Sequence, residues 1–186
     1  MHELLGDLAA TREDDAKAVE EYRAAIVLSP NSANLHYKLG HMFWKDSNVS
    51  DARDEFEQEL KANPNHSAAL QEMGETYLLQ HQPDEALHYL QRALQSDADD
   101  PDLHRDLGTA YTQLEQYAKA ELEFKLAMTG DHDGSVHYKL AKVYQAMGRK
   151  PDADREFSIY RTMNRNIHEK LEEKGQRLSD IGRAPE

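Results

Sequence analysis

Histidine recurs at a regular distance along this chain, and imidazole is a side chain that can bind a metal or carry a proton. The recurring residues are His2, His36, His104 and His137, and Leu70 stands midway between the second and the third of them. Imidazoles at one repeating interval raise the hypothesis of a zinc site, in which each ligand atom lies about 2 Å from the ion. Whether they can meet depends on the elements that carry them.

Residue patterns that support catalysis are otherwise absent from the sequence. The chain contains neither Gly-x-Gly-x-x-Gly nor Gly-Lys-Ser/Thr, the loops that cradle phosphates. His168 and Glu169 begin like a zinc-protease helix, but Glu172 stands where that motif requires a second histidine. With 35 acidic residues, carboxylate pairs at helical spacing are expected by chance, and no cysteine is present. We therefore expect no enzyme active site, no cofactor and no metal.

The histidines belong to a longer pattern with a period of about 34 residues. A small residue recurs at this period, with the last step one position shorter, at Gly6, Gly40, Gly74, Gly108 and Ala141. An alanine follows each of them at a fixed distance, and one helical turn after it comes a large apolar residue, at Tyr22, Phe56, Leu90, Phe124 and Phe157. A fixed period of this length is typical of a solenoid, whose repeats bury their apolar faces only against their neighbours. Such an array favours a binding surface over a catalytic pocket.

Helical spacing of apolar residues runs along almost the whole chain, and no stretch alternates long enough to form a strand. Short turn signals divide the chain into ten predicted helices in five antiparallel pairs. The predicted repeats are 1–32, with a first helix that begins inside the pattern, 33–66, 67–100, 101–133 and 134–166. Residues 167–186 are expected to form a capping extension of the last helix, ended by Gly175, and a frayed tail from Ile181.

These residues resemble the tetratricopeptide repeat, whose pattern runs Trp-x-x-Leu-Gly-x-x-Tyr, then Ala-x-x-x-Phe, then Pro. The resemblance covers roughly residues 1–165, although proline closes the repeat only at Pro30 and Pro64. It implies an all-α, right-handed superhelical solenoid of five helix-turn-helix repeats with an extended C-terminal capping helix. The small residue is expected to let the two helices of a repeat approach closely, and the aromatic residue three positions later to fill the gap between them.

Within this resemblance, the histidines occupy the usual tryptophan position of the family. Equivalent positions in neighbouring repeats lie on parallel helices about 8–10 Å apart, which is too far for two imidazoles to share a zinc ion. We expect each histidine to pack with a hydrogen-bonded ring nitrogen. Half-buried neutral imidazoles would make the array lose stability as the pH falls through about 6.5.

The resemblance also implies a concave groove lined by the first helix of each repeat. The residues that we expect to contact a partner there are Asn34, Tyr37, His41, Trp44, Gln71, Glu75, Arg105, Thr109, Tyr138 and Lys142. Aromatic and arginine side chains are common interface anchors, although packing between repeats is an equally open interpretation for Trp44. Glu3 and Asp7 replace the lysine and asparagine with which family members hold an acidic peptide C-terminus. That clamp is therefore not expected.

The charge of the chain restricts its partners. A net charge of −13 argues against nucleic acid, which requires a basic stripe on the protein. No run approaches the ~18 apolar residues of a membrane span, so no membrane insertion is expected. A cytoplasmic location is the default expectation, unless a leader precedes Met1 in a longer protein.

Three hypotheses about function follow from the sequence. The favoured one is a non-catalytic scaffold for protein–protein interaction that binds a peptide or protein segment in the groove. The alternative is a regulatory or targeting segment of a larger enzyme or of an assembly or secretion factor. A third is homo-oligomerisation, or an intramolecular contact, through the N-terminal edge, where Leu4, Leu5 and Leu8 form an apolar face.

Overall fold

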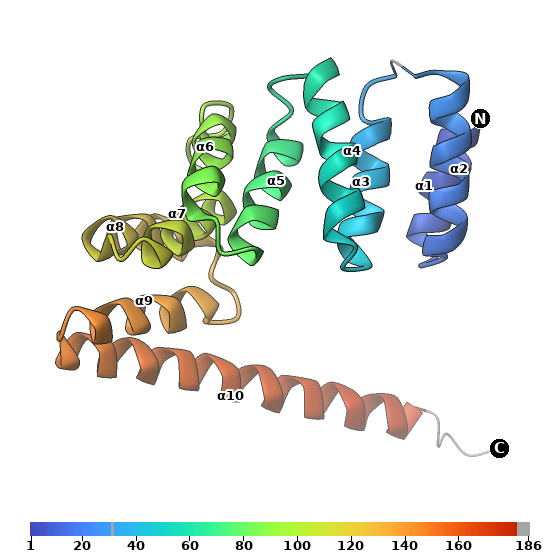
Figure 1. Ribbon diagram of the computed structural model, residues 1–186. Helices are drawn as coiled ribbons and strands as arrows, with labels where there is room; N and C mark the ends of the chain where they lie inside the picture. The colour runs from blue at the N-terminus through green and yellow to red at the C-terminus, as the bar shows by residue number, and fades with distance from the viewer. Residues whose placement is uncertain (31, 182–186) are drawn as a thin grey trace. The chain divides into compact units, whose positions relative to one another are not determined.

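A computed structural model describes residues 1–30 and 32–181, with side chains as far as Glu172 (Figure 1). These residues form ten α-helices, one 3₁₀ turn and no strand. The helices are α1 (His2–Thr11), α2 (Asp15–Leu28), α3 (Leu35–Lys45), α4 (Val49–Ala62), α5 (Ser67–Leu79), α6 (Pro83–Leu94), α7 (Pro101–Gln113), α8 (Tyr117–Ala127), α9 (Ser135–Ala146) and α10 (Lys150–Ile181), with η1 (Met128–Gly130) after α8. The all-α class predicted from the sequence is thus confirmed.

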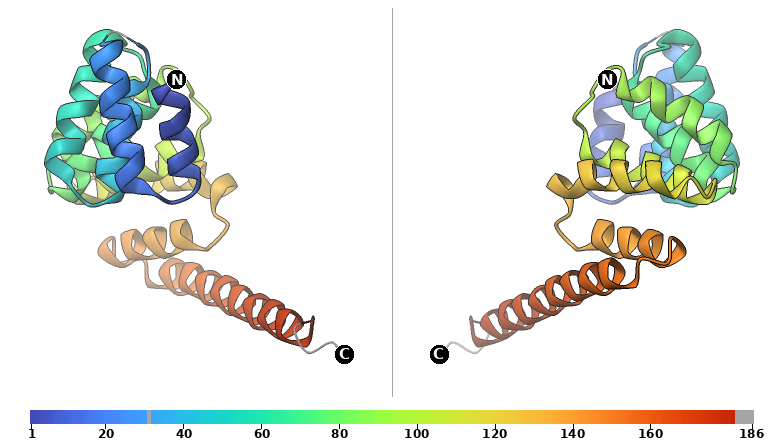
Figure 2. Two further views of the ribbon diagram at one scale, coloured as in Figure 1. Left: turned by 90° about the vertical axis from the view of Figure 1, so that its right-hand side faces the viewer. Right: turned by 90° about the vertical axis from the view of Figure 1, so that its left-hand side faces the viewer.

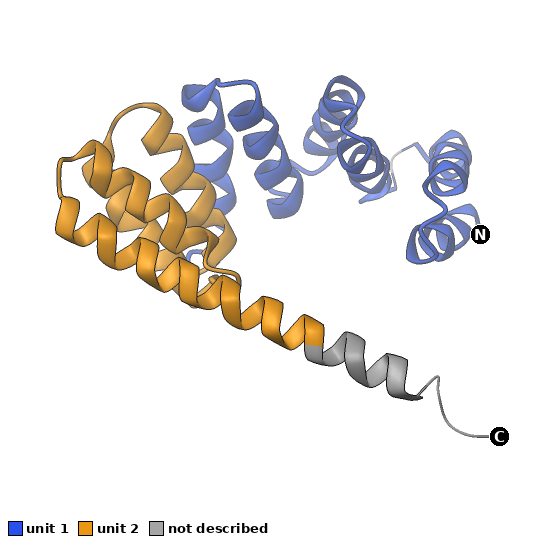
Figure 3. Ribbon diagram, turned by 90° about the horizontal axis from the view of Figure 1, so that it is seen from below, with its two compact units in different colours: residues 1–98 blue, residues 99–186 orange. Residues whose placement is uncertain are grey.

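The helices pack as consecutive pairs, α1 with α2 and so on to α9 with α10, and the second helix of a pair often also contacts the next pair. The pairing of α9 with α10 is visible from two further directions in Figure 2. The chain divides into two compact units, residues 1–98 and residues 99–186 (Figure 3). The first unit contains α1–α6 and the second contains α7–α10.

Each pair closes through the same tight turn. One residue in each turn has a positive φ: 60° at Glu13, 59° at Ser47, 56° at His81, 58° at Glu115 and 72° at Gly148. The N–H of the following residue donates to the carbonyl oxygen five positions before it, as Asn48 does to Phe43 at 2.8 Å. This is the helix-ending motif in which a left-handed residue satisfies the last carbonyl groups. In four of the five turns the left-handed residue is not glycine, so its side chain makes that backbone conformation less favourable.

The small residues of the repeating pattern mark the closest approach within each pair. A Cβ added to Gly40 would lie 2.6 Å from the ring of Phe56, and one added to Gly108 would lie 2.7 Å from the ring of Phe124. Gly6 and Gly74 face Tyr22 and Leu90 in the same way. The residue that fills the gap therefore comes from the second helix, and the prediction that the aromatic three positions after the glycine fills it is wrong.

The last helix is longer than the sequence indicated. α10 continues without a break from Lys150 to Ile181, so the prediction that Gly175 ends it is wrong. Glycine in a helix interior costs only about 1 kcal/mol relative to alanine, which weakens a helix without stopping it. The predicted frayed tail after Ile181 lies outside the described residues.

The N-terminal edge of the first unit exposes apolar side chains, as the sequence suggested. Leu4 is 73% exposed, Leu8 47% and Leu5 38%. The residues that correspond to Leu5 one and two repeats later, Leu39 and Met73, are buried. Among the described residues, no helix is both long and apolar enough to cross a membrane.

Candidate functional site

Three predicted groove residues of the first unit lie together on α3. The rings of Tyr37 and His41 are 6.1 Å apart, and the ring of His41 stacks on that of Trp44 at 6.2 Å. Trp44 and Tyr37 are partly buried and pack against the hydrophobic core of this unit. These three side chains therefore form an aromatic cluster that is also part of the packing between repeats.

A carboxylate of the following repeat holds this cluster. Oε1 of Glu72, on α5, accepts a hydrogen bond from the hydroxyl of Tyr37 at 3.1 Å and lies 2.8 Å from Nδ1 of His41. The hydrogen bond to Glu72 is the main reason that the pKa of His41 is raised above its usual value, and burial opposes it. Burial, with the nearby Glu72 charge, also raises the pKa of Tyr37. Both polar groups are engaged within the protein.

Asn34 has a structural position at the entry to α3. Its backbone is left-handed, with φ of 70°, and its N–H donates to the buried Glu59 at 3.2 Å. Its side-chain oxygen accepts from Nε2 of His66 at 2.8 Å; His66 Nδ1 accepts from the N–H of Ala69, so the proton lies on Nε2. The remaining two predicted residues of this unit, Gln71 and Glu75, lie one turn apart on α5.

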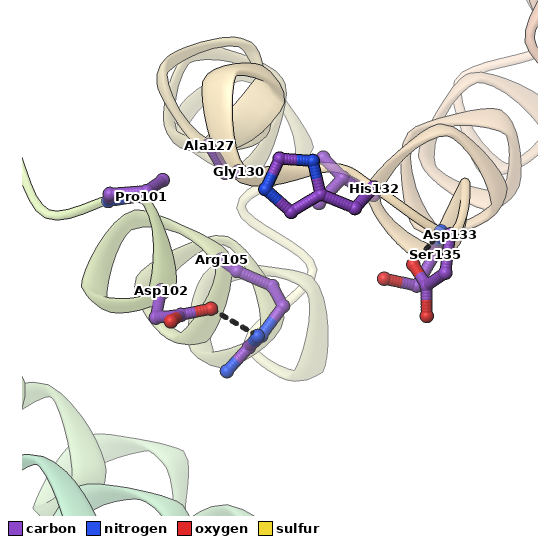
Figure 4. Close-up of a pocket in the computed structure, with 9 residues that line it drawn as sticks. Pro101, Asp102, Arg105, Ala127, Gly130, His132, Asp133 and Ser135 are labelled. Atoms are coloured by element: carbon purple, nitrogen blue, oxygen red, sulfur yellow. Dashed lines mark hydrogen bonds and ion pairs between the residues drawn. The ribbon is translucent and has the colours of Figure 1, made fainter.

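Arg105 of the second unit lines a pocket of about 280 Å³ between α7 and the segment before α9 (Figure 4). Its guanidinium forms ion pairs with Asp102 and Asp106. The close-up shows His132 and Asp133 on the other wall of this pocket. Thr109, one turn after Arg105, donates its hydroxyl to the carbonyl oxygen of Arg105 at 2.9 Å.

A second pocket of about 270 Å³ opens beside Tyr138 on α9. Tyr138 is 44% exposed, and its ring lies 5.2 Å from that of Tyr160 on α10. The lining also includes Lys139, which the sequence prediction did not select, while the predicted Lys142 is exposed one turn further along α9. Asp133 and Ser135 line both of these pockets. The second unit thus brings Arg105, Tyr138 and Lys139 to neighbouring pockets.

The pKa of Lys139 is shifted in the opposite direction from that of Lys38. Burial lowers its pKa, the attraction of Asp106 offsets part of that effect, and the charge of Arg105 adds to it. No carboxylate lies within ion-pair distance of its amine in the described part of the chain. The sequence could have indicated Lys139 as a candidate, because it occupies the same register position in its repeat as Lys38 does in the second repeat.

The repeating histidines each contact a glutamate of the second helix of their own repeat. The four Nδ1–Oε2 distances are between 2.6 and 2.7 Å, for the pairs His2–Glu21, His36–Glu55, His104–Glu123 and His137–Glu156. The predicted hydrogen-bonded ring nitrogen is therefore confirmed. The glutamates were missed, although each follows its histidine at the same separation along the chain, and the third repeat has Leu70 and Tyr89 at these places.

These pairs define the surroundings of the repeating histidines. A carboxylate of the paired helix faces each of the four rings, and the acid sensitivity expected from the sequence stays a prediction. Within the residues that have described side chains, no three histidine, aspartate or glutamate side chains are placed to hold a metal ion. The repeating histidines serve as polar contacts between paired helices.

Comparison with known families matches the repeat pattern. One family model, described as TPR repeat, matches residues 6–47, and two others, described as tetratricopeptide repeat, match residues 55–88 and 77–135. Anaphase-promoting complex subunit 3 of Schizosaccharomyces pombe (strain 972 / ATCC 24843) is 27% identical over 158 residues, which are 84% of this chain. The chain spans 24% of the length of that relative.

Solved structures show the same fold. MamA 41-end from Desulfovibrio magneticus RS-1 superposes with a TM-score of 0.81 at 20% identity, over 89% of this chain and 94% of that one. A crystal structure of MamA protein gives a TM-score of 0.77 at 18% identity, over 90% and 92% of the two chains. Arrays of such repeats present extended binding surfaces and generally act as protein-interaction scaffolds rather than as catalysts. By its repeat pattern, its paired helices and these matches, the chain belongs to the tetratricopeptide repeat family.

Proposed function

We propose that this protein is a scaffold that binds an extended peptide or protein segment on the first-helix face of its second unit. The proposed surface, called here the basic-aromatic surface, consists of Arg105, Tyr138, Lys139, Lys142 and Tyr160. The observation that carries the proposal is the pair of adjoining pockets beside Arg105 and Lys139, which share Asp133 and Ser135.

The composition of this surface supports the proposal. Tyr138 is exposed although its ring is held against Phe157 and Tyr160, so its orientation is set before a partner arrives. Rigid aromatic side chains lose little conformational entropy on binding and are frequent anchors of interfaces. Lys139 and Lys142 add positive charge in a protein whose net charge is −13, which favours an acidic or neutral partner over a basic one.

The first unit carries a separate proposed surface of its own. It is made of the six groove residues predicted there, Asn34, Tyr37, His41, Trp44, Gln71 and Glu75. Because Tyr37 and His41 already bond Glu72, a partner would have to compete with these contacts. We therefore give the basic-aromatic surface the larger share of binding.

Affinity capture with quantified partners tests the proposal. The comparison is between wild type, Tyr138→Ala, Trp44→Ala and the control Leu122→Ala, which removes a 63% exposed side chain from α8. Anchor residues cost about 2 kcal/mol or more when truncated, so at least one partner should be lost from Tyr138→Ala and retained by Leu122→Ala. Partners that survive all three substitutions equally would show that binding occurs elsewhere.

A second candidate function is that this array works as one part of a larger assembly factor. The comparison that favours it is the relative named as a complex subunit, of which the chain spans 24%. The sequence that flanks these residues in the gene tests it. A continuous reading frame into a further domain supports this function, and a frame limited to the repeats contradicts it.

Self-association through the N-terminal edge is a further proposal about partners. It is supported by the exposure of Leu4, Leu5 and Leu8 on α1. Light scattering should then give a mass above one chain for wild type and a single-chain mass for Leu4→Gln with Leu8→Gln. Wild type that stays monomeric at high concentration would remove this proposal.

A further inference from the structure

Lys38 and Lys139 stand at the same register position of two different repeats. Lys38 lies on α3, two residues before Gly40, and Lys139 lies on α9, two residues before Ala141. The amine of Lys38 donates to Oε1 of Glu3 at 2.9 Å and to the two carboxylate oxygens of Asp7 at 2.8 and 2.9 Å. A lysine at this position therefore reaches back to carboxylates on the first helix of the preceding repeat.

The carboxylates that this lysine position binds in the second repeat are missing at Lys139. The residues of α7 that correspond to Glu3 and Asp7 are Arg105 and Thr109. Arg105 is bonded to Asp102 and Asp106, and the hydroxyl of Thr109 donates to a backbone carbonyl. Neither residue supplies an anion in place of those carboxylates.

The pKa values of the two lysines follow this difference. Burial lowers the pKa of both amines, but hydrogen bonds to Asp7 and Glu3 outweigh burial at Lys38, whose pKa is raised overall. At Lys139, burial prevails over the attraction of Asp106, and the pKa is lowered. Two lysines in one register thus differ because one has carboxylate partners.

Lys139 is one of the residues that line a pocket between α9 and α10. The other residues that line the pocket are Asp133, Ser135, Tyr138, Tyr160 and Asn164. The carboxylate of Asp133 accepts from the N–H of Ser135 at 2.9 Å at the start of α9, and this bond contributes most to lowering its pKa. A Cβ added to Gly134 would lie 3.1 Å from the ring of Tyr160, so α9 and α10 meet closely here.

We propose that the pocket at Lys139 binds the carboxylate of an aspartate or glutamate side chain in the bound segment, with an apolar neighbour of that residue against Tyr138 and Tyr160. This inference rests on the proposed function and adds the chemical class of the partner. The carboxylate of the ligand accepts hydrogen bonds from the amine of Lys139, as the carboxylates of Glu3 and Asp7 do from the amine of Lys38. A hydrogen-bonded ion pair also removes the cost of holding the amine half-buried without an anion.

A peptide array tests the proposal. The probes are N-acetylated, C-amidated hexapeptides with alanine at the outer positions and all amino-acid pairs at the two central ones. Amidation leaves side chains as the only source of carboxylate. Wild type should select aspartate or glutamate next to a large apolar residue. For the selected peptide in solution, Lys139→Met should weaken binding about tenfold or more, because it removes the charge-assisted hydrogen bond to the peptide carboxylate.

Two further variants separate the pocket from general attraction. Lys150→Met removes the same charge from an exposed site of the same unit, at the start of α10 and outside the basic-aromatic surface, and should change the affinity less than twofold at physiological salt, because exposed charges there are screened. Lys139→Arg keeps the charge and should retain most of the binding. Thermal unfolding of each variant verifies that it is folded.

Each of the following results would contradict the inference and would show which part of it is wrong. Equal losses from Lys139→Met and Lys150→Met would show diffuse attraction instead of a pocket. Selection of peptides without an acidic residue would overturn the acidic class while leaving the proposed function in place. A second array of the same peptides with free C-termini is probed in parallel, and binding only to that array would assign the site to a chain end. No binding of any peptide to wild type would count against the proposed function as well.

Discussion

Nδ1 of His104 lies 2.7 Å from Oε2 of Glu123, its partner on the paired helix. The same contact recurs in three other repeats. In the third repeat the two positions hold Leu70 and Tyr89 instead. The polar pair and the apolar pair are thus alternative solutions for one place in the repeat.

This relationship predicts strong coupling between the two positions. His104→Leu alone removes the imidazole that faces the carboxylate of Glu123, and Glu123→Tyr alone removes the carboxylate that faces the largely buried imidazole. Each should lower the free energy of unfolding by about 1–3 kcal/mol. The double variant copies the third repeat and should recover roughly 1 kcal/mol or more of the summed loss. Chemical denaturation of the four proteins measures the coupling, and purely additive losses would contradict it.

The contact between His41 and Glu72 predicts a pH dependence with a definite sign. The pKa of His41 is raised above 6.5 in the folded protein, chiefly by the hydrogen bond to Glu72 and further by Glu75, while burial and Lys45 oppose the shift. Its stabilisation is therefore fully present below about pH 6.5 and is lost as the pH rises through the folded-state value. The melting temperature of wild type minus that of His41→Gln should be larger at about pH 6 than at about pH 8.5.

The fluorescence of Trp44 offers a direct measurement of the same titration. Trp44 is the single tryptophan of the chain and stacks on His41. A protonated imidazole in ring contact quenches indole, so emission should rise with pH, with a midpoint above 6.5. His41→Gln serves as the control and should remove this transition. A midpoint at or below 6.5 in wild type would contradict the assigned shift.

The same substitution at Lys38 and Lys139 should have opposite effects on stability. Lys38→Met leaves Glu3 and Asp7 facing each other without their cation and should cost about 1 kcal/mol. Lys139→Met removes a half-buried amine that has no carboxylate within ion-pair distance in the described residues, so stability should be unchanged or higher. Denaturant midpoints at low salt measure both. A clear loss from Lys139→Met would show that its amine has an internal partner.

The close helix approach at Gly40 predicts intolerance of larger residues there. A Cβ at this place would meet the Phe56 ring at 2.6 Å and the carbonyl oxygen of Ala52 at 3.2 Å. Gly40→Val should therefore destabilise the first unit by about 2–3 kcal/mol through overpacking. Ala141→Gly, at the same register position, is the control and should cost only the ~1 kcal/mol of helix propensity. Similar losses from both would argue against a steric cause.

The sequence by itself determined the period, the helices and their pairing, but not which large residue fills the gap at each glycine. A repeat of this kind buries each apolar face against its neighbour, so the positions of Gly40, Phe56 and their equivalents follow from the spacing alone. The histidine–glutamate pairs were also within reach of the sequence, because both residues lie in one repeat at a constant separation.

Contacts between neighbouring repeats were decided only by the tertiary structure. The period assigns Lys38, Glu72 and Lys139 to one register position, but it does not show which side chains of the preceding helix they meet. Lys38 meets two carboxylates, Glu72 meets Tyr37 and His41, and Lys139 meets no carboxylate at ion-pair distance among the described residues. A hydrogen bond depends on side-chain direction to within a fraction of an ångström. Periodicity places helices, and packing in three dimensions selects the partners of their polar side chains.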